Sequence, residues 1–484
     1  MEEIKYKEWI NILEREPNIK NDGTKDVGPL VQKIINDTDF CVLYFPKGKY
    51  LFKTGVTINK EITLQGDSNS STSATQFITS GVPNMSIITL IGRKQCIKNI
   101  SFYSDSCEML VHDEPPTKGN PHYHYEMLIK TNENNEKMEG VSAITTDGLA
   151  HTYRGLGHYE NLSISGFSGI GIQIPYYAIS NDITVSSCGL GIDTGIDVII
   201  SNSRISKCQD GMRIMTGTNI NNVRIEKIQK VGLKSNQEDG HESFGRYVIN
   251  NITIDQCGHC GFLFGSIFES FISGIIRRCG QRYYNTDYDT YLEMKNGDKN
   301  EIGEAGAYSL LCGKYFTNCY VNLVSDNEDN WDDGLEYKHK VYVFETLKIP
   351  NSALKCNIND YNYAVKAFEG GGNLRLQNNT NNYLFIDKLN INSSNMDLAS
   401  PAAINGINLR EYDKNGNLLK LYGGKFIFKD GNEEKEIFKS NPGLIVKSTD
   451  SDISQIKSTY GSNWEKVGSE LIGKETVYYY KYTS

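Results

Sequence analysis

The stretch that decides the fold runs from Ile179 to Met215 and reads ISNDITVSSCGLGIDTGIDVIISNSRISKCQDGMRIM. Within it, the pattern that begins at Asp182 returns 20 residues later, at Asn202. Each copy holds a polar residue, a β-branched residue three positions on, and then a cysteine and a glycine. Short β-branched runs separated by Gly, Asn and Ser indicate strands joined by tight turns.

The same pattern extends over residues 159–281. Its β-branched residue recurs at steps of 21, 20, 20, 29 and 22 residues, at Ile164, Val185, Ile205, Ile225, Ile254 and Ile276. A period of 20 to 22 residues is typical of one coil of a parallel β-helix, in which each coil stacks on the previous one. A leucine-rich repeat has a similar period, but its dense leucine pattern does not occur in this sequence.

Stacking turns equivalent residues into ladders along the coils. Cysteines stand three positions after the β-branched residue in four of six repeats, at Cys188, Cys208, Cys257 and Cys279. We therefore predict that these thiols line the core in reduced form, although the chain has 11 cysteines. The asparagines that open the strands are predicted to bond to one another through their side-chain amides at a tight turn.

Composition excludes some classes of function. The formal net charge is −9, so nucleic-acid binding is not expected, because phosphate neutralisation needs a basic surface. Membrane insertion is not expected either, since the sequence holds no run of 18 apolar residues. The polar N-terminus shows no secretory signal, and we expect synthesis in a cytoplasm.

The N-terminal part carries a resemblance to a known family. An amphipathic segment at 27–35 is followed by Val42-Leu-Tyr-Phe-Pro-Lys-Gly-Lys-Tyr-Leu51 and Ile62-Thr-Leu-Gln-Gly-Asp67. This resembles the first coil of the pectate-lyase-like superfamily, as found in bacteriophage tailspikes, in which a short helix caps a right-handed parallel β-helix. The resemblance implies an all-β fold, a polysaccharide partner, a homotrimer, and a place in the virion tail with action outside the cell.

Three segments are expected. Residues 1–20 form a polar extension, 21–385 the parallel β-helix domain, and 386–484 a C-terminal β-rich domain that serves binding or trimerisation. Turn pairs such as Asn415-Gly416 and Asp430-Gly431 predict antiparallel hairpins in that last segment, and hence a small β-sandwich.

The repeat also predicts which side chains face outward, because strand neighbours of an inward residue point the other way. One flank should carry a charged patch of Arg204, Arg224, Glu226, Asp255 and Arg277. We predict that the arginines hold anionic groups of a glycan, while Glu226 or Asp255 acts as general acid or base. The alternative is that these charges only neutralise one another along a solvated sheet.

Two interruptions of the repeat complete the predicted site. The first loop brings Asp239, His241 and Glu242 to the edge of the patch as catalytic partners, or is simply a polar loop tip. The second, at 282–291, offers Tyr283 and Tyr284 to bind sugar rings, or packs on itself. A further outward row adds Arg213 to the expected substrate-binding residues.

A rival site lies earlier in the chain. In the segment His122-Tyr-His-Tyr-Glu126, alternation places His122, His124 and Glu126 on one side of a strand, which suits a divalent metal. The alternative is that these three residues alternate by chance within an irregular, proline-containing loop.

The sequence therefore predicts a tailspike-like depolymerase that cleaves a bacterial cell-surface polysaccharide by hydrolysis or β-elimination and needs no cofactor. A metal-assisted phosphodiesterase acting on teichoic acid is the second hypothesis, with a divalent metal as its cofactor. A glycan receptor-binding protein without catalysis is the third.

Overall fold

The structure is a computed structural model of the 484-residue chain. It describes residues 8–69, 74–112, 123–147, 156–235, 244–264, 266–280 and 282, and then the strands between Ser309 and Tyr482. The chain divides into two compact units, one of Met1–Leu376 with Leu384–Met396, and one of Gln377–Tyr383 with Asp397–Ser484.

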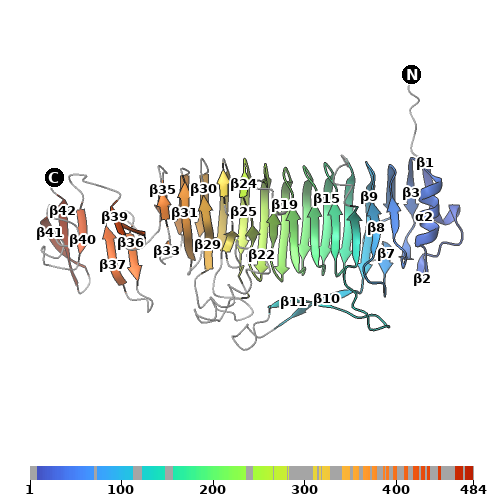
Figure 1. The fold of residues 1–484 in the computed structure, drawn as a ribbon, viewed down its shortest axis with the longest axis horizontal. Helices are drawn as coiled ribbons and strands as arrows, with labels where there is room; N and C mark the ends of the chain where they lie inside the picture. The colour runs from blue at the N-terminus through green and yellow to red at the C-terminus, as the bar shows by residue number, and fades with distance from the viewer. Residues whose placement is uncertain are drawn as a thin grey trace, which may run out of the picture. The chain divides into compact units, whose positions relative to one another are not determined.

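The first unit begins with a cap. Its elements are β1 (Glu8–Asn11), α1 (Ile12–Arg15), β2 (Asp22–Asp26) and α2 (Gly28–Asp37). The helix α2 buries Val31, Ile34 and Ile35 at the end of the strand stack, which confirms the predicted capping helix (Figure 1). Its start is held by Asp26, whose carboxylate accepts a hydrogen bond from the backbone N–H of Gly28 at 3.0 Å.

One long parallel ladder, here called sheet A, follows the cap. Its successive strands are β3 (Cys41–Phe45), β6 (Ile62–Gly66), β9 (Cys96–Ser104), β13 (His158–Ser165), β15 (Ile179–Ser186), β17 (Ile199–Ser206), β19 (Asn219–Ile228), β22 (Val248–Cys257), β25 (Phe271–Arg277), β28 (Tyr320–Asp326) and β30 (Ala353–Ile358). The same sheet also holds β4 (Gly48–Leu51), β7 (Thr75–Thr79), β32 (Asn373–Asn378) and β35 (Met396–Ala399).

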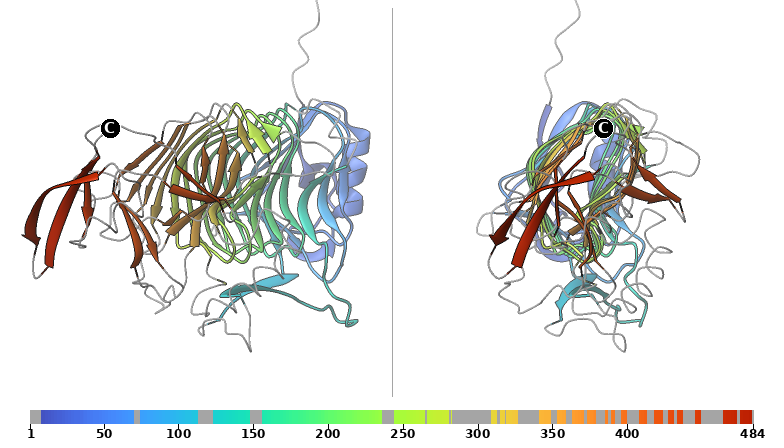
Figure 2. Two further views of the ribbon diagram at one scale, coloured as in Figure 1. Left: turned by 60° about the vertical axis from the view of Figure 1, so that its left-hand side comes forward. Right: turned by 90° about the vertical axis from the view of Figure 1, so that its left-hand side faces the viewer.

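A second parallel ladder, sheet B, forms another wall. Its strands are β5 (Val56–Ile58), β8 (Ser86–Leu90), β12 (Ser142–Thr146), β14 (Ile170–Ile174), β16 (Leu190–Thr194), β18 (Asp210–Ile214), β20 (Leu233–Ser235), β23 (Phe262–Leu263), β26 (Ser309–Cys312), β29 (Val341–Lys348) and β31 (Tyr363–Gly370). Shorter strands join it at β21 (Phe244–Gly245), β24 (Ser266–Phe268), β27 (Tyr315–Thr317), β33 (Phe385–Ile386) and β34 (Leu389–Ile391). Seen along the stack, the coils superpose around a common core (Figure 2). The fold is a right-handed parallel β-helix, as predicted.

The coils turn at residues with left-handed backbone. In one coil these are Asn202, Lys207 and Gly217, with φ of 51°, 54° and 76°. Asparagine tolerates this conformation better than most residues do, which explains why it recurs in the pattern. The predicted amide ladder is present: Asn222 donates through Nδ2 to Oδ1 of Asn202 at 2.8 Å, and Asn251 donates to Asn222 at 3.2 Å.

The predicted cysteine ladder is confirmed as well. Cys188, Cys208, Cys257 and Cys279 are fully buried, and the cysteines of the described residues are free thiols. Burial raises the pKa of Cys188 and of Cys257 well above the ordinary thiol value. Ile164, Val185, Ile205, Ile225 and Ile254 form the neighbouring inward ladder and are also buried.

One hairpin leaves the coils and lies along them (Figures 1 and 2). It pairs β10 (Cys107–Val111) with β11 (Tyr125–Ile129) in antiparallel register. Two contacts near its base and middle tie it to distant coils. The thiol of Cys107 donates to the carbonyl of Ser187 at 3.2 Å, and the N–H of Met127 donates to Oε1 of Gln229 at 3.1 Å.

The second unit contains the antiparallel pairs that its turn residues predict. Strand β36 (Asn408–Tyr412) pairs with β37 (Leu418–Gly423), and β38 (Ile427–Asp430) pairs with β39 (Glu433–Glu436). The last sheet has the order β40 (Ile445–Ser448), β42 (Glu475–Tyr482), β41 (Trp464–Ile472). Among the described residues of both units, no helix has the length and apolarity needed to cross a bilayer.

Candidate functional site

Glu226 lies at the centre of the predicted charged patch. It is near the end of β19, at a strand position that faces away from the core, yet only 5 % of it is exposed. Two arginines account for this difference from the expected solvent-facing carboxylate. Arg204 donates to Oε1 through Nε at 3.0 Å and through its terminal nitrogen, and Arg224 donates to Oε2 through Nε at 2.5 Å.

These contacts set the protonation state of Glu226. Burial raises the pKa of its carboxyl, but hydrogen bonds from Arg204 and Arg224, together with their charges, outweigh burial and leave the pKa below the ordinary value. Glu226 is therefore ionised at neutral pH. In this state it holds the two guanidinium groups in place and has no proton to donate as a general acid.

Asp255 occupies the equivalent position one coil further on, in register with Glu226. It is 2 % exposed and is held by Arg278, whose Nε and terminal nitrogen donate to its two oxygens at 2.8 and 2.7 Å. The sequence suggested Arg277 as its neighbour, and Arg277 does pair with Asp255 in strand register. The bidentate partner is nevertheless the next residue, which has left-handed backbone with φ of 48°. The sequence signal that could have pointed to Arg278 is its place directly before Cys279, because the residues directly before the ladder cysteines have left-handed backbone in the structure.

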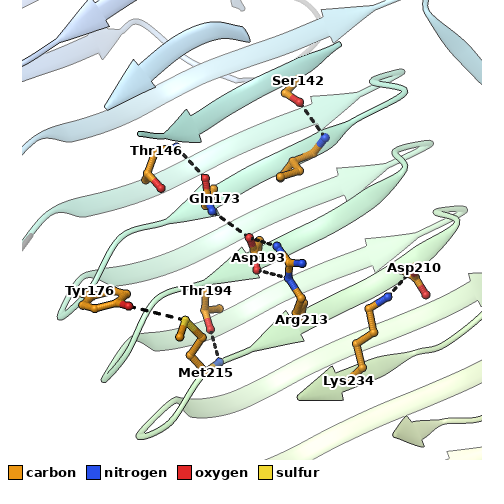
Figure 3. Close-up of polar contacts among 11 residues, drawn as sticks. Ser142, Thr146, Gln173, Tyr176, Asp193, Thr194, Asp210, Arg213, Met215 and Lys234 are labelled. Carbon is orange, nitrogen blue, oxygen red and sulfur yellow. Dashed lines mark hydrogen bonds and ion pairs between the residues drawn. The ribbon is translucent and has the colours of Figure 1, made fainter. Parts of the chain in front are cut away.

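A second charged row lies on sheet B (Figure 3). Arg213 donates to both oxygens of buried Asp193, at 2.8 and 2.6 Å, and Gln173 donates to the same carboxylate at 3.0 Å. Lys234 pairs with Asp210 at 2.7 Å. Arg213 is therefore on a different sheet from Arg204 and Arg224, although all three were predicted to bind one substrate.

The predicted metal site is only partly described. Glu126 pairs with Nε2 of His112 at 2.8 Å, and His124 is buried beside the ring of Tyr125. Within the described part of the chain, no group of three or more His, Cys, Asp or Glu side chains is arranged to hold a metal ion. The other predicted site residues lie outside the described residues: His122, Asp239, His241, Glu242, Tyr283 and Tyr284.

Sequence reasoning missed one buried cluster. The hydroxyl of Tyr123, at the loop end of the hairpin just before β11, lies 2.6 Å from Nε2 of His259 on the coil after β22. The guanidinium carbon of Arg282 lies 4.1 Å from the centroid of the Tyr123 ring, within cation–π range. Tyr123 and His259 are 136 positions apart in the sequence, so no local pattern joins them. The cluster fastens the hairpin to the coils.

Comparisons with known proteins agree with this architecture. Residues 9–213 match the family described as rhamnogalacturonase A/epimerase, pectate lyase-like. This part of the chain is therefore similar to the pectate-lyase-like family. The match covers the cap and the coils up to β18, including Arg204 but not Glu226 or Asp255. Among curated proteins, none matches the sequence.

The solved structures that are similar to this chain share little sequence with it. The A-module of the mannuronan C-5 epimerase AlgE6 from Azotobacter vinelandii is 12 % identical, with 81 % of this chain and 98 % of that chain covered and a TM-score of 0.47. PfbA, a surface adhesin of Streptococcus pneumoniae, is 11 % identical, with 90 % and 99 % covered and a TM-score of 0.46. The enzymatically active domain of tailspike protein 2 of bacteriophage CBA120 is 12 % identical, with 84 % and 54 % covered and a TM-score of 0.44. At such identities the likeness concerns the fold.

Proposed function

We propose that the chain binds an anionic bacterial surface polysaccharide along the flank of its β-helix and cleaves it, as a tailspike-type depolymerase. The observation that carries this proposal is the guanidinium pair of Arg204 and Arg224. The two arginines are register partners on neighbouring strands, and their side chains are 59 % and 54 % exposed while bonded to buried Glu226. Solvent-accessible cations fixed in this way suit the recognition of carboxylate or phosphate groups.

The arrangement favours binding for a physical reason. A guanidinium has five N–H donors, so the bonds to Glu226 leave donors for a ligand. Because Glu226 already fixes both side chains, less rotamer entropy is lost when a glycan binds. A repeating anionic polymer also matches a wall whose equivalent residues recur about every 4.8 Å.

Cleavage needs further groups. In β-elimination, Arg204 and Arg224 would neutralise a uronate carboxylate while a base removes the neighbouring proton; a C=C double bond forms and the glycosidic oxygen leaves with the next sugar. In hydrolysis, a carboxyl group would protonate the leaving oxygen while water supplies the new bond to the anomeric carbon, directly or after a covalent intermediate. The ionised state of Glu226 leaves the acid role to another residue, and Asp255, Asp239, His241 and Glu242 remain the proposed candidates. We propose that the protein is part of the virion tail. From there it would act on capsule or teichoic acid outside the cell.

The test is release of saccharides from purified capsule and cell-wall fractions. Arg204→Ala and Arg224→Ala should each weaken turnover at low substrate concentration about 10-fold or more, because a charge-assisted hydrogen bond is worth about 1.5–3 kcal/mol. Arg246→Ala is the matched control, since Arg246 pairs at 3.3 Å with the exposed carboxylate of Glu269 at another corner. Equal activity of all three variants would place the site elsewhere.

The same assay separates the other two hypotheses. Loss of release on addition of EDTA, with recovery by a divalent metal, would favour the phosphodiesterase at the 112–126 segment. Binding of the fractions without any release would favour a receptor-binding protein and would contradict cleavage.

A further inference from the structure

Toward the cap, sheet A continues from Arg204 as a surface of small hydroxyl side chains. On β9, β13 and β15, the outward register rows that lead away from Arg204 and Ser206 hold serine, threonine and tyrosine. We call this surface the hydroxyl track, and its residues are Tyr103, Ser163, Ser165, Thr184, Ser186 and Ser206. The three steps from β17 to β9 span about 14 Å, which is long enough for more than one sugar residue.

The hydroxyl groups of the track are available to a ligand. Thr184 is exposed and Ser163 is half-buried, and neither side chain hydrogen-bonds to another of the described residues. In the second row Ser186 donates to Ser165 at 3.0 Å, which leaves the proton of Ser165 for another acceptor. A glycan that lies here would therefore find both donors and acceptors for its own hydroxyl groups.

An exposed aromatic ring stands at the far end of the track. Tyr103 is 53 % exposed and is the register partner of Ser165. A tyrosine offers a flat apolar face and a hydroxyl, which suits contact with a sugar ring. The hairpin borders the same surface, because Cys107 of β10 donates to the carbonyl of Ser187, the residue directly after Ser186.

Charge distinguishes the track from the arginine pair. Arg204 and Arg224 share the single carboxylate of Glu226, so this cluster keeps one surplus positive charge for one anionic group. The side chains of the track are uncharged. Beside it stand one exposed carboxylate, Asp182 on β15, and one exposed lysine, Lys207 at the corner after β17. A polymer with an anionic group on every sugar would thus meet cations at β17 and β19, but a carboxylate at β15.

Other charged side chains near the track, among the described residues, are acidic or paired. Asp105, directly after β9, is exposed. Lys130 of the hairpin pairs with Glu108 at 2.8 Å, and Lys98 on β9 pairs with Glu160 at 2.9 Å. The surface toward the cap therefore does not repeat the surplus positive charge of the arginine pair.

We propose that the hydroxyl track binds uncharged sugar residues next to the anionic residue that Arg204 and Arg224 hold. This inference rests on the proposed function and narrows its substrate class. The polysaccharide is a heteropolymer in which an anionic residue is followed by neutral ones, and not a polymer with an anionic group in every unit. Hydroxyl groups of the neutral sugars bond to Ser163 and Thr184, and one ring packs on Tyr103.

The experiment measures binding of the chain to the capsule and cell-wall fractions of the release assay. Ser163→Gln and Ser163→Glu form a matched pair, because the two new side chains are similar in size and differ in charge. Ser163 lies two coils, about 10 Å, from Arg204, which Glu226 holds from the other side. Both variants should weaken binding by the same factor, about 3- to 10-fold, because either side chain displaces a neutral sugar from the track.

A second variant tests the aromatic end. Tyr103→Ala should weaken binding about 3- to 10-fold and leave its dependence on salt unchanged, because a stacked neutral sugar contributes no ion pair. Arg204→Ala should weaken binding and also reduce the dependence on salt. Tyr177→Ala is the control for Tyr103→Ala, since Tyr177 is 38 % exposed at a corner outside the track.

The outcomes separate the inference from the proposed function. Binding by Ser163→Gln as tight as that of the wild type, or by Tyr103→Ala as tight as that of Tyr177→Ala, would overturn the inference. So would a difference of 10-fold or more between Ser163→Glu and Ser163→Gln, because a charged sugar would then lie on the track. In each of these cases, weaker binding by Arg204→Ala would still support the proposed function. A chain that binds neither fraction contradicts both.

Discussion

At the scale of the residue, an outward strand position does not determine the exposure of a side chain. Glu226 and Asp255 face away from the core, but arginines from the same or neighbouring coils cover them. Each carboxylate is thereby hydrogen-bonded, and the exposed charge beside Glu226 belongs to Arg204 and Arg224. A buried and paired carboxylate orients its partners, and this is the role that the geometry gives Glu226.

The lowered pKa of Glu226 gives a pH-dependent stability. A carboxyl whose pKa is lower in the folded than in the unfolded state stabilises the fold above its unfolded pKa, and this contribution is lost as the pH falls through the folded value. Glu226→Gln should therefore lower the free energy of unfolding by about 1–3 kcal/mol at pH 7. The difference from wild type should shrink as the pH falls below about 4.

Urea unfolding at several pH values measures this effect. Glu269→Gln is the control, since Glu269 pairs with Arg246 at the surface, and its effect should stay within about 0.5 kcal/mol. The free energy of unfolding of Glu226→Gln is compared with that of the wild type at each pH. A difference that stays constant from pH 7 to pH 3 would show that the arginines do not lower the pKa of Glu226.

The cysteine ladder makes a second prediction at this scale. The raised pKa of Cys188 and Cys257 keeps these thiols protonated at pH 8, and burial excludes reagents from them. A maleimide should therefore label partly exposed Cys96 first, and should label Cys188, Cys208 and Cys257 only after unfolding. Mass spectrometry of the digested protein gives the order. Fast labelling of the three buried thiols in the native protein would refute the register of the coils.

At the scale of the element, periodicity determines what could be predicted. The strands between residues 159 and 281 could be predicted from the sequence, because each coil repeats the same kinds of inward residue. The cap could be predicted because its sequence resembles the first coil of a known family. The hairpin of β10 and β11 could not be predicted, since it has no period and its anchors are distant in sequence. Arg278 was missed for a related reason: its side chain leaves a left-handed corner, where alternation along a strand no longer applies.

The hairpin should loosen when its buried anchor is shortened. Tyr123→Phe removes the hydroxyl that contacts His259 and should destabilise the protein by about 1 kcal/mol. Hydrogen exchange should accelerate at the amide of Met127, which bonds to Gln229, while the amides of β17 stay protected. Tyr177→Phe, at an exposed corner, is the control. Unchanged exchange at Met127 would show that the other contacts hold the hairpin without this pair.

At the scale of the whole molecule, one sheet carries two different surfaces. On sheet A, Arg204 and Arg224 form a charged pair, whereas Ile199, Val248 and Phe271 belong to another row of register positions and expose apolar side chains. Because the coils stack in register, a residue type that recurs at one register position lines up along the axis; arginine is kept there over two coils, with Thr184 before it and Thr253 after it. A homotrimer is implied by the family resemblance, and self-association of this chain stays a prediction.

The homotrimer that the resemblance implies would have a thermodynamic consequence that does not depend on measuring mass. A partner that binds only the folded chain stabilises it by mass action, so the urea midpoint should rise with protein concentration. Between 0.5 and 50 µM, each tenfold increase in concentration adds up to about 1.4 kcal/mol per binding event while association is limiting. A chain that stays monomeric should instead show a midpoint that is independent of concentration. The slope of the midpoint against concentration, rather than the midpoint itself, is therefore the quantity to measure. A wild-type midpoint that stays flat over this range would contradict the expected homotrimer.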